Sequence, residues 1–124
     1  MTSLTITIPV PSPKLSPNAR VHWRVKATLV KAARLTARLI SREALGSNPA
    51  PLWDKCSARV VAYFPTMKRP DPDNLIARLK ATFDGIADAQ IIMDDANLWP
   101  ERPVILKDAK NPRIEITITP ENNQ

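Results

Sequence analysis

Residues 68–74, KRPDPDN, join two stretches of different periodicity. Before them, residues 55–64 alternate in the period-2 pattern of a half-buried strand. After them, residues 72–88 space their large apolar side chains three and four apart, which is helical spacing. Pro72 disfavours the helical conformation at Asp71 and suits the first helical position. The sequence therefore predicts a strand, a turn and a helix, with Asp71 at the N-cap.

Periodicity elsewhere predicts the rest of a single domain. Residues 4–8 alternate as a strand, residues 23–45 have helical spacing, and two more strands are expected at 104–107 and 113–119, joined by a turn at 108–112. The expected fold class is α+β, with a small mixed or antiparallel sheet of about four strands packed with two main helices. We assign residues 1–120 to the domain and 121–124 to a frayed tail.

The long helix at 23–45 has two contrasting sides. The side expected to face the core consists of Val25, Leu29, Ala32, Ala33, Thr36, Leu39 and Ile40. The opposite side is basic and consists of Arg24, Lys31, Arg34, Arg38 and Arg42. Glu43 is the only acidic residue in the segment, so like charges face one another at helical spacing, which is destabilising. An anionic partner would relieve this repulsion, although a solvated basic face is the simpler alternative.

Charge is distributed unevenly along the 124 residues. Residues 1–69 carry 12 Lys and Arg against 2 acids, whereas residues 70–124 carry 6 against 10. A basic half favours a polyanionic partner such as nucleic acid, and a local excess of acid favours a cation site. No apolar run is long enough to cross a bilayer, and the N-terminus lacks the pattern of a signal peptide. With Cys56 as its only cysteine, the chain is expected in a bacterial-type cytoplasm, without disulfides.

The aspartates after the turn allow two interpretations. Asp71 at the N-cap and Asp73 in the first turn would both be stabilised by free N–H groups and the helix dipole, without any metal. However, two carboxylates within one turn repel each other unless a cation lies between them. A second pair, Asp94 and Asp95, follows the apolar run 91–93, which we expect to be strand-like. Carboxylates from several elements suit Mg²⁺ and phosphodiester hydrolysis.

Two other kinds of site are excluded by the sequence. A calcium-binding loop starting at Asp71 would need glycine where Ile76 stands and glutamate where Thr82 stands. His22 is the only histidine, and we expect it to pack beside Trp23 at the helix start, so no Ser/His or Cys/His relay is available.

The acidic segments resemble a known family, the RusA-type Holliday junction resolvases of prophages and bacteria. Residues 69–75 (RPDPDNL), 80–86 (KATFDGI) and 94–97 (DDAN) are similar to that family's R-x-D-x-D-N-L, K-A-x-x-D-[AG]-[LI] and D-D-x-x signatures, in the same order. The resemblance also covers the first strand and its Pro-rich turn, residues 18–23 and the last two strands.

The resemblance implies a metal-dependent endodeoxyribonuclease acting in DNA recombination and repair. It implies catalysis and Mg²⁺ binding by Asp71, Asp73 and Asp95, with Mn²⁺ able to substitute, and a catalytic lysine at Lys80. The groups expected to support them are Asn74, Asp84, Asp94 and Arg78. The residues expected to meet DNA phosphates are Lys68, Arg69, Arg24, Lys31, Arg34 and Arg38. The family also implies a homodimer that resolves four-way junctions by paired symmetric nicks.

The chain departs from the family at two positions. The spacing between Asn74 and Lys80 is about one turn longer than in short-spaced members, so Arg78 is the alternative to Lys80. Gln90 stands where many members have glycine, so either this residue takes a helix-ending conformation or the helix ends differently. Two other functions remain open, namely a branched-DNA-binding protein without cleavage activity and a nuclease for flaps or other branched DNA.

Overall fold

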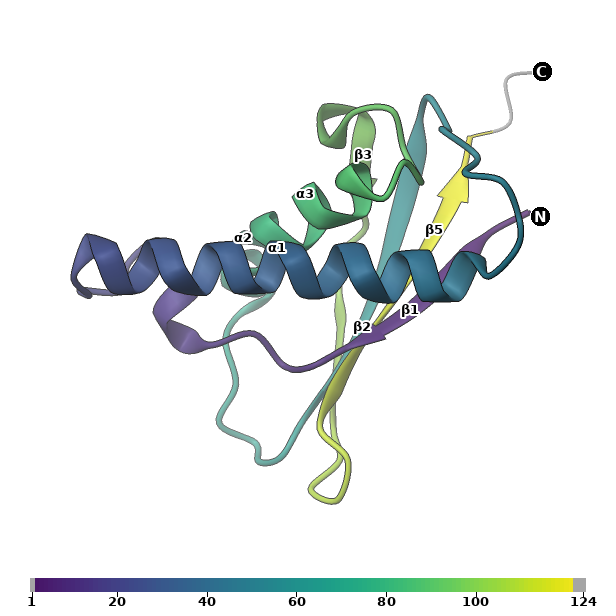
Figure 1. Ribbon diagram of the computed structural model, residues 1–124. Coiled ribbons are helices and arrows are strands. Elements are labelled where there is room, and N and C mark those ends of the chain that lie inside the picture. The colour runs from purple at the N-terminus through teal and green to yellow at the C-terminus, as the bar shows by residue number, and fades with distance from the viewer. Residues whose placement is uncertain (1, 122–124) are drawn as a thin grey trace.

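The computed structural model describes residues 2–121 and confirms the α+β class. Three α-helices and a five-stranded sheet form one small domain, with two short 3-10 helices in the connections (Figure 1). In chain order the elements are β1 Leu4–Ile8, η1 Pro13–Leu15, α1 Trp23–Leu45, β2 Cys56–Phe64, α2 Pro72–Arg78, α3 Lys80–Asp88, η2 Asp95–Asn97, β3 Leu98–Pro100, β4 Val104–Lys107 and β5 Arg113–Pro120. None of the described helices is both long and apolar enough to cross a membrane.

Strand β2 is the centre of the sheet. It pairs antiparallel with β5, which in turn pairs with β1, while β3 and β4 run parallel to β2 along its other edge. The expected strands 104–107 and 113–119 are therefore correct in position but are not neighbours, because β2 lies between them. Strand β3 was not predicted, since three residues are too few to show alternation.

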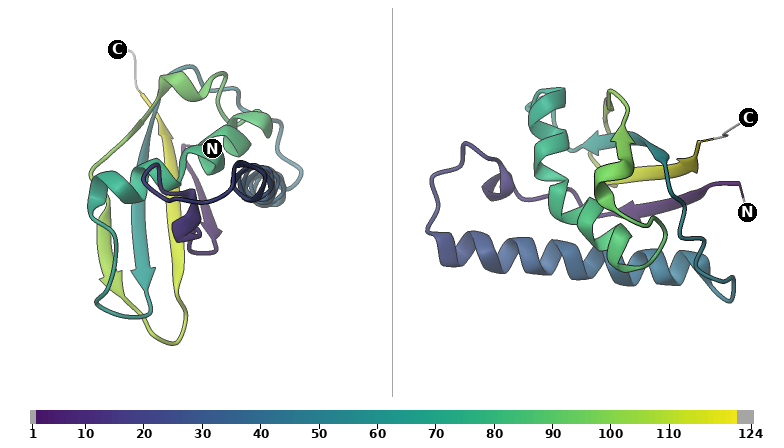
Figure 2. Two further views of the ribbon diagram at one scale, coloured as in Figure 1. Left: turned by 90° about the vertical axis from the view of Figure 1, so that its left-hand side faces the viewer. Right: turned by 90° about the horizontal axis from the view of Figure 1, so that it is seen from above.

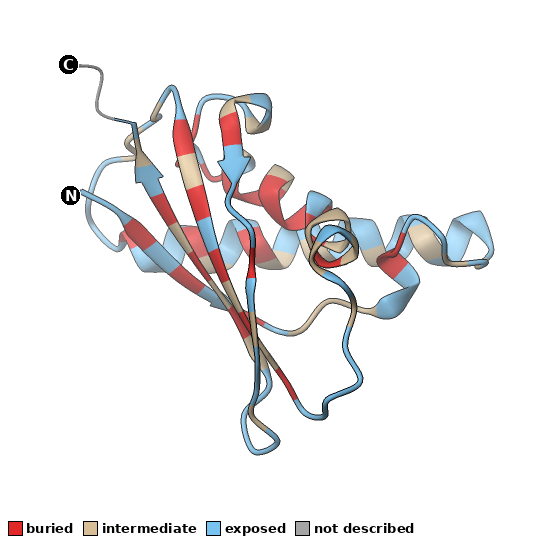
Figure 3. Cartoon of the chain, turned by 180° about the vertical axis from the view of Figure 1, so that it is seen from behind, coloured by how far each residue is buried: buried red, intermediate tan, exposed pale blue. Residues whose placement is uncertain are grey.

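The core lies between the sheet and the helices, which cover one of its faces (Figure 2). Buried and more exposed residues alternate along the long strands, as predicted for half-buried strands (Figure 3). In β5 the inward residues Ile114, Ile116 and Ile118 are fully buried. Cys56 of β2 is also fully buried.

The helix predicted at 72–88 is divided in two. Leu79 ends α2 and precedes α3, with φ −91° and ψ 3°, and its N–H donates to the Ile76 carbonyl in a tighter turn. No glycine or proline marks this break in the sequence. Leu75 and Leu79 are both fully buried, so tertiary packing holds the interruption in place.

Helix α1 packs through a face that overlaps the predicted one in part, because Leu29, Ala33 and Ile40 are half-buried. Its buried residues are Ala37, Ser41 and Leu45, spaced four apart, whereas Leu39 is 58% exposed and Val25 is 44% exposed. The part nearer its N-terminus projects past the sheet (Figure 1). A long amphipathic pattern therefore overestimated how much of this helix reaches the core.

A glycine explains which face of α1 is buried. A Cβ on Gly85 of α3 would lie 2.2 Å from the Arg34 carbonyl oxygen and 2.8 Å from the Ala37 Cβ. The two helix backbones can approach this closely only because Gly85 has no side chain. The closest packing of α1 is thus at its middle, on small residues, rather than along its row of larger apolar ones.

The connection after α3 contains the predicted helix-ending residue. Gln90 has a left-handed backbone with φ 65°. The apolar run that follows is not a strand, because Ile92 makes only an isolated bridge with Trp53. At the chain's end, the Glu121 N–H donates to the Lys55 carbonyl at 2.8 Å, so Glu121 is held by the domain. The rest of the predicted tail, 122–124, lies outside the described residues.

Candidate functional site

Asp71 caps α2 as predicted. Its backbone is extended, with φ −69° and ψ 164°, and its Oδ1 accepts a hydrogen bond of 2.8 Å from the Asn74 N–H. Pro72 occupies the first turn of the helix, where its missing N–H has no cost. The cap fixes the Asp71 carboxylate in one orientation while Oδ2 makes no hydrogen bond within the described residues.

Asp71 and Asp73 open onto the same hollow. This hollow, which we call the Asp71–Asp73 hollow, has a volume of about 430 Å³. Its lining residues are Pro17, Asn18, Asp71, Pro72, Asp73, Asn74, Ala77 and Arg102. Asp73 is exposed and makes no hydrogen bond or ion pair within residues 2–121. Two carboxylates with free oxygens therefore share one solvent-filled space.

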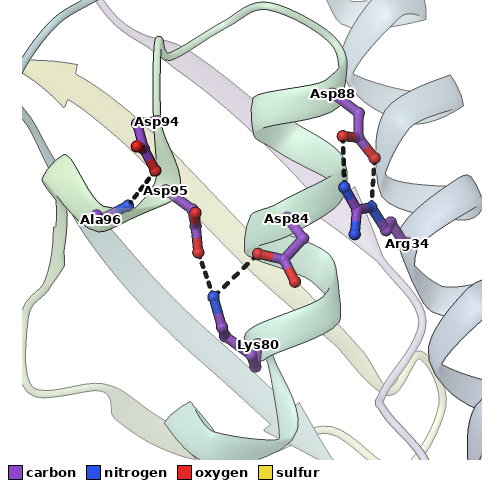
Figure 4. Close-up of polar contacts among 7 residues, drawn as sticks. All are labelled: Arg34, Lys80, Asp84, Asp88, Asp94, Asp95 and Ala96. Carbon is purple, nitrogen blue, oxygen red and sulfur yellow. Dashed lines mark hydrogen bonds and ion pairs between the residues drawn. The ribbon is translucent and has the colours of Figure 1, made fainter.

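Asp95 lies beside Lys80 rather than beside the first two aspartates. The Lys80 Nζ donates to Asp95 Oδ2 and, at 3.0 Å, to Asp84 Oδ1, so the ammonium lies between two carboxylates (Figure 4). Asp94 caps the following 3-10 helix by accepting from the Ala96 N–H at 3.0 Å. Of the two adjacent aspartates, Asp94 thus caps the 3-10 helix that follows it, and Asp95 contacts Lys80.

The contact between Lys80 and Asp95 keeps both groups ionised near neutral pH. The hydrogen bond from Lys80 lowers the pKa of Asp95 to about 2, and the same bond raises the pKa of Lys80. Asp95 is therefore an anion and Lys80 a cation under ordinary conditions. Lys80 can supply positive charge or a hydrogen bond, but it is poorly suited to act as a general base.

The two parts of the site are neighbouring hollows. Asp95 and Lys80 line a second hollow of about 450 Å³, the Lys80–Asp95 hollow, which shares the wall residues Pro17 and Ala77 with the first. Within residues 2–121, no three His, Cys, Asp or Glu side chains are grouped closely enough to hold a metal ion. The carboxylate oxygens of Asp71 and Asp73 fit Mg²⁺ in their chemistry. The third predicted ligand, Asp95, is not brought to them.

Asn74 and Arg78 support the fold around the hollow. The Asn74 side-chain amide donates to Ser16 Oγ at 2.8 Å, and its oxygen accepts from Arg78 Nε at 2.8 Å. Asn74 thus ties α2 to the Pro-rich segment that follows β1. Of the two candidates for the basic position, Lys80 contacts Asp95, whereas Arg78 contacts Asn74.

The predicted DNA-binding residues differ in whether an acidic side chain neutralises them. Arg34 makes two hydrogen bonds to Asp88, at 2.5 and 2.8 Å, so part of the basic side of α1 is neutralised by α3. The lack of acidic residues within 23–45 does not predict this pairing, because Asp88 comes from a distant segment. Five of the predicted residues are exposed and make no ion pair within the described residues: Arg24, Lys31, Arg38, Lys68 and Arg69.

The predicted aromatic contact at the start of α1 is present. His22 caps the helix by accepting from the Arg24 N–H at 3.1 Å, and its ring stacks on Trp23 with centroids 5.8 Å apart. The Arg24 guanidinium lies 5.2 Å from the centre of the Trp23 ring. Arg24 remains exposed, so this contact leaves it open to an anion.

Sequence reasoning did not identify Arg102 as a candidate site residue. Arg102 lies between β3 and β4 and lines the Asp71–Asp73 hollow although it is 29 positions away from Asp73 in the chain. The only local signal is a single arginine between two prolines, Pro100 and Pro103. Its proximity to the aspartates depends on the parallel pairing of β3 and β4 with β2, which no short pattern predicts.

Comparison with known proteins identifies a relative but no described function. No family model matches the chain. The chain is 39% identical over 117 residues to an uncharacterized protein of Xylella fastidiosa, and the aligned region covers 93% of this chain and 75% of that protein. The chain therefore belongs to the same family as this uncharacterized Xylella protein.

Proposed function

We propose that the chain is a Mg²⁺-dependent endodeoxyribonuclease of the RusA type that cleaves four-way DNA junctions. The observation that carries the proposal is the shared hollow of Asp71 and Asp73, where one carboxylate is oriented by a helix cap and the other is unpaired. Within one turn, such a pair is stable near neutral pH when a cation lies between the two groups. The three sequence signatures support the same activity.

In this proposal Asp71 and Asp73 hold the metal ion. When bound, Mg²⁺ would supply charge to neutralise a phosphate and to activate water for hydrolysis. We propose that Asp95 joins the site through Lys80, whose ammonium is held by Asp84 and Asp95 at the edge of the neighbouring hollow. There Lys80 would contribute positive charge near a phosphate group.

The proposed substrate and setting follow from the resemblance and the charge distribution. The exposed basic residues Lys31, Arg38, Lys68 and Arg69 would bind DNA backbone, which positions the protein without reading sequence. Paired nicking requires two active sites, so we propose a homodimer. The proposed setting is the cytoplasm of a bacterial or phage-infected cell, where recombination and repair occur.

The direct test is cleavage of a labelled synthetic four-way junction with Mg²⁺ or with EDTA. We expect nicks only with Mg²⁺, and we expect Asp73→Asn to bind the junction without cutting it. Asp54→Asn is the matched control, because Asp54 is exposed and lines none of the described hollows, and it should cleave normally.

The alternatives give different results in the same assay. A duplex and a flap substrate run in parallel distinguish a junction nuclease from one acting on other branched DNA. Junction binding without cleavage of any substrate would favour a binding protein, for which the separation of Asp95 from Asp71 and Asp73 is the supporting observation. Full activity of Asp73→Asn would contradict the metal assignment.

A further inference from the structure

Among residues 2–121, Arg102 is the only cationic residue that lines the Asp71–Asp73 hollow. It is exposed and makes no hydrogen bond or ion pair within the described residues, although Asp73 lines the same hollow. With Asp73, it also lines an adjoining hollow of about 350 Å³ formed with residues 100–103. The Arg102 guanidinium lines two hollows beside the aspartates and has no partner within the described residues, so it is available to bind a ligand.

The chain holds the backbone of Arg102 in a fixed place. Pro100 pairs with Ala58 of β2, and Val104 pairs with Val61 of the same strand, so only residues 101–103 bridge two anchored positions. The Glu101 N–H donates to the Ala58 carbonyl at 2.8 Å, and Pro103 is buried. Two prolines and three anchors leave this bridge little freedom. Arg102 is therefore presented from a rigid support, which favours binding.

The chemistry around Arg102 favours an anionic oxygen ligand. A guanidinium binds phosphate with two parallel N–H groups, and the Asn18 amide on the same lining is a further donor. An anion beside Asp71 and Asp73 alone would be repelled, whereas one between Arg102 and a cation held by these aspartates would be neutralised from both sides. The simpler alternative is that Arg102 serves only as a counter-charge for Asp73.

We propose that Arg102 binds a phosphodiester group of DNA in the Asp71–Asp73 hollow. This inference rests on the proposed function, because it takes DNA as the ligand. Arg102 contacts the substrate phosphate and positions it over the two carboxylates. The basic residues of α1 and residues 68–69 do not line this hollow, so they would bind DNA phosphates outside it.

Binding without catalysis isolates the role of Arg102. Fluorescence anisotropy with a labelled junction in Ca²⁺, a cation that carboxylate oxygens also bind, compares wild type with Arg102→Ala and Arg102→Lys at several salt concentrations. Arg59→Ala is the matched control, since Arg59 is exposed on β2 and lines none of the described hollows. We expect Arg102→Ala to bind about tenfold more weakly. Its plot of log affinity against log salt should be shallower by about 0.9, the value for one lost phosphate contact.

The lysine variant tests the geometry separately from the charge. Arg102→Lys should recover the salt slope of wild type but cleave the junction more slowly with Mg²⁺, because an ammonium cannot form the two-pronged contact. A counter-charge role would give wild-type binding in Arg102→Ala. Thermal unfolding should be unchanged in all three variants, which excludes a loss of folding as the cause.

The outcomes separate this inference from the proposed function. If Arg102→Ala binds with wild-type affinity and slope while the wild type cleaves, only the role of Arg102 is overturned. If binding depends on Arg102 but no substrate is cleaved, only the proposed nuclease activity fails. A wild-type chain that binds no DNA would overturn both.

Discussion

Gln90 has a backbone conformation that favours glycine. Its φ of 65° costs a residue with a side chain about 1–2 kcal/mol, part of which glycine would give back through the greater freedom of the unfolded chain. Gln90 also accepts a hydrogen bond of 3.2 Å from Arg42, but this contact is exposed and weak. The residue ends α3 at the expense of some stability.

Gln90→Gly is therefore expected to stabilise the domain. The free energy of unfolding should rise by about 0.5–1 kcal/mol, as measured by urea denaturation. Gln90→Ala keeps the strained backbone and loses the Arg42 contact, so it should be no more stable than wild type. A loss of stability in the glycine variant would show that the side chain of Gln90 matters more than its backbone.

The ion pair between Arg34 and Asp88 predicts a pH dependence. Arg34 lowers the pKa of Asp88, so the pair stabilises the fold above the unfolded carboxylate value of about 3.9. This contribution is lost as the pH falls through the lower pKa of the folded state. The difference in unfolding free energy between wild type and Arg34→Gln should be full at pH 7 and should shrink below about pH 4. Lys31→Gln, on the same helix but without an ion pair within the described residues, should show no such trend.

At the scale of elements, the packing of α1 on α3 depends on Gly85. Replacing it with alanine would place a Cβ against the Arg34 carbonyl oxygen, which is backbone and cannot rotate away. The helices would have to separate. The free energy of unfolding should fall by about 1–3 kcal/mol, the range for overpacked cores.

Gly85→Ala and Gly46→Ala make a matched pair, because they are the only glycines in the chain. A Cβ on Gly46 would meet nothing within 4 Å, so its cost comes only from its φ of 59°, about 1–2 kcal/mol. We expect Gly85→Ala to lower the thermal midpoint more than Gly46→Ala does. Equal effects would mean that α1 and α3 can move apart easily.

The elements differ in how well the sequence predicted them. Strands β1, β2 and β5 were predicted from alternation because one face of each is buried, and the same alternation reappears in their burial. The break at Leu79 and the short strand β3 were not predicted, because both depend on distant packing rather than on local residue preferences. For α1, the periodicity predicted the helix correctly, but the predicted core-facing side only partly overlaps the buried one, which is centred on Ala37, Ser41 and Leu45.

At the scale of the molecule, the sequence predicted the parts of the candidate site better than their arrangement. The sequence predicted the cap at Asp71 because Pro70 and Pro72 restrict the backbone on both sides of it. The contact of Lys80 with Asp95, and the placement of Arg102 beside Asp73, arise from separate elements that meet only in the folded chain. A metal site of three aspartates was an expectation of the resemblance, and the described residues bring two of them together.

We propose that the chain resolves four-way junctions by metal-dependent paired incision. The most direct measurement uses a supercoiled plasmid with an extruded cruciform, incubated with the purified chain and Mg²⁺. Paired incision across the junction within one binding event gives linear DNA, so we predict linear product with Mg²⁺, none with EDTA and none with Asp73→Asn. An intact plasmid with bound protein, or nicked circles without linear DNA, would contradict the claim.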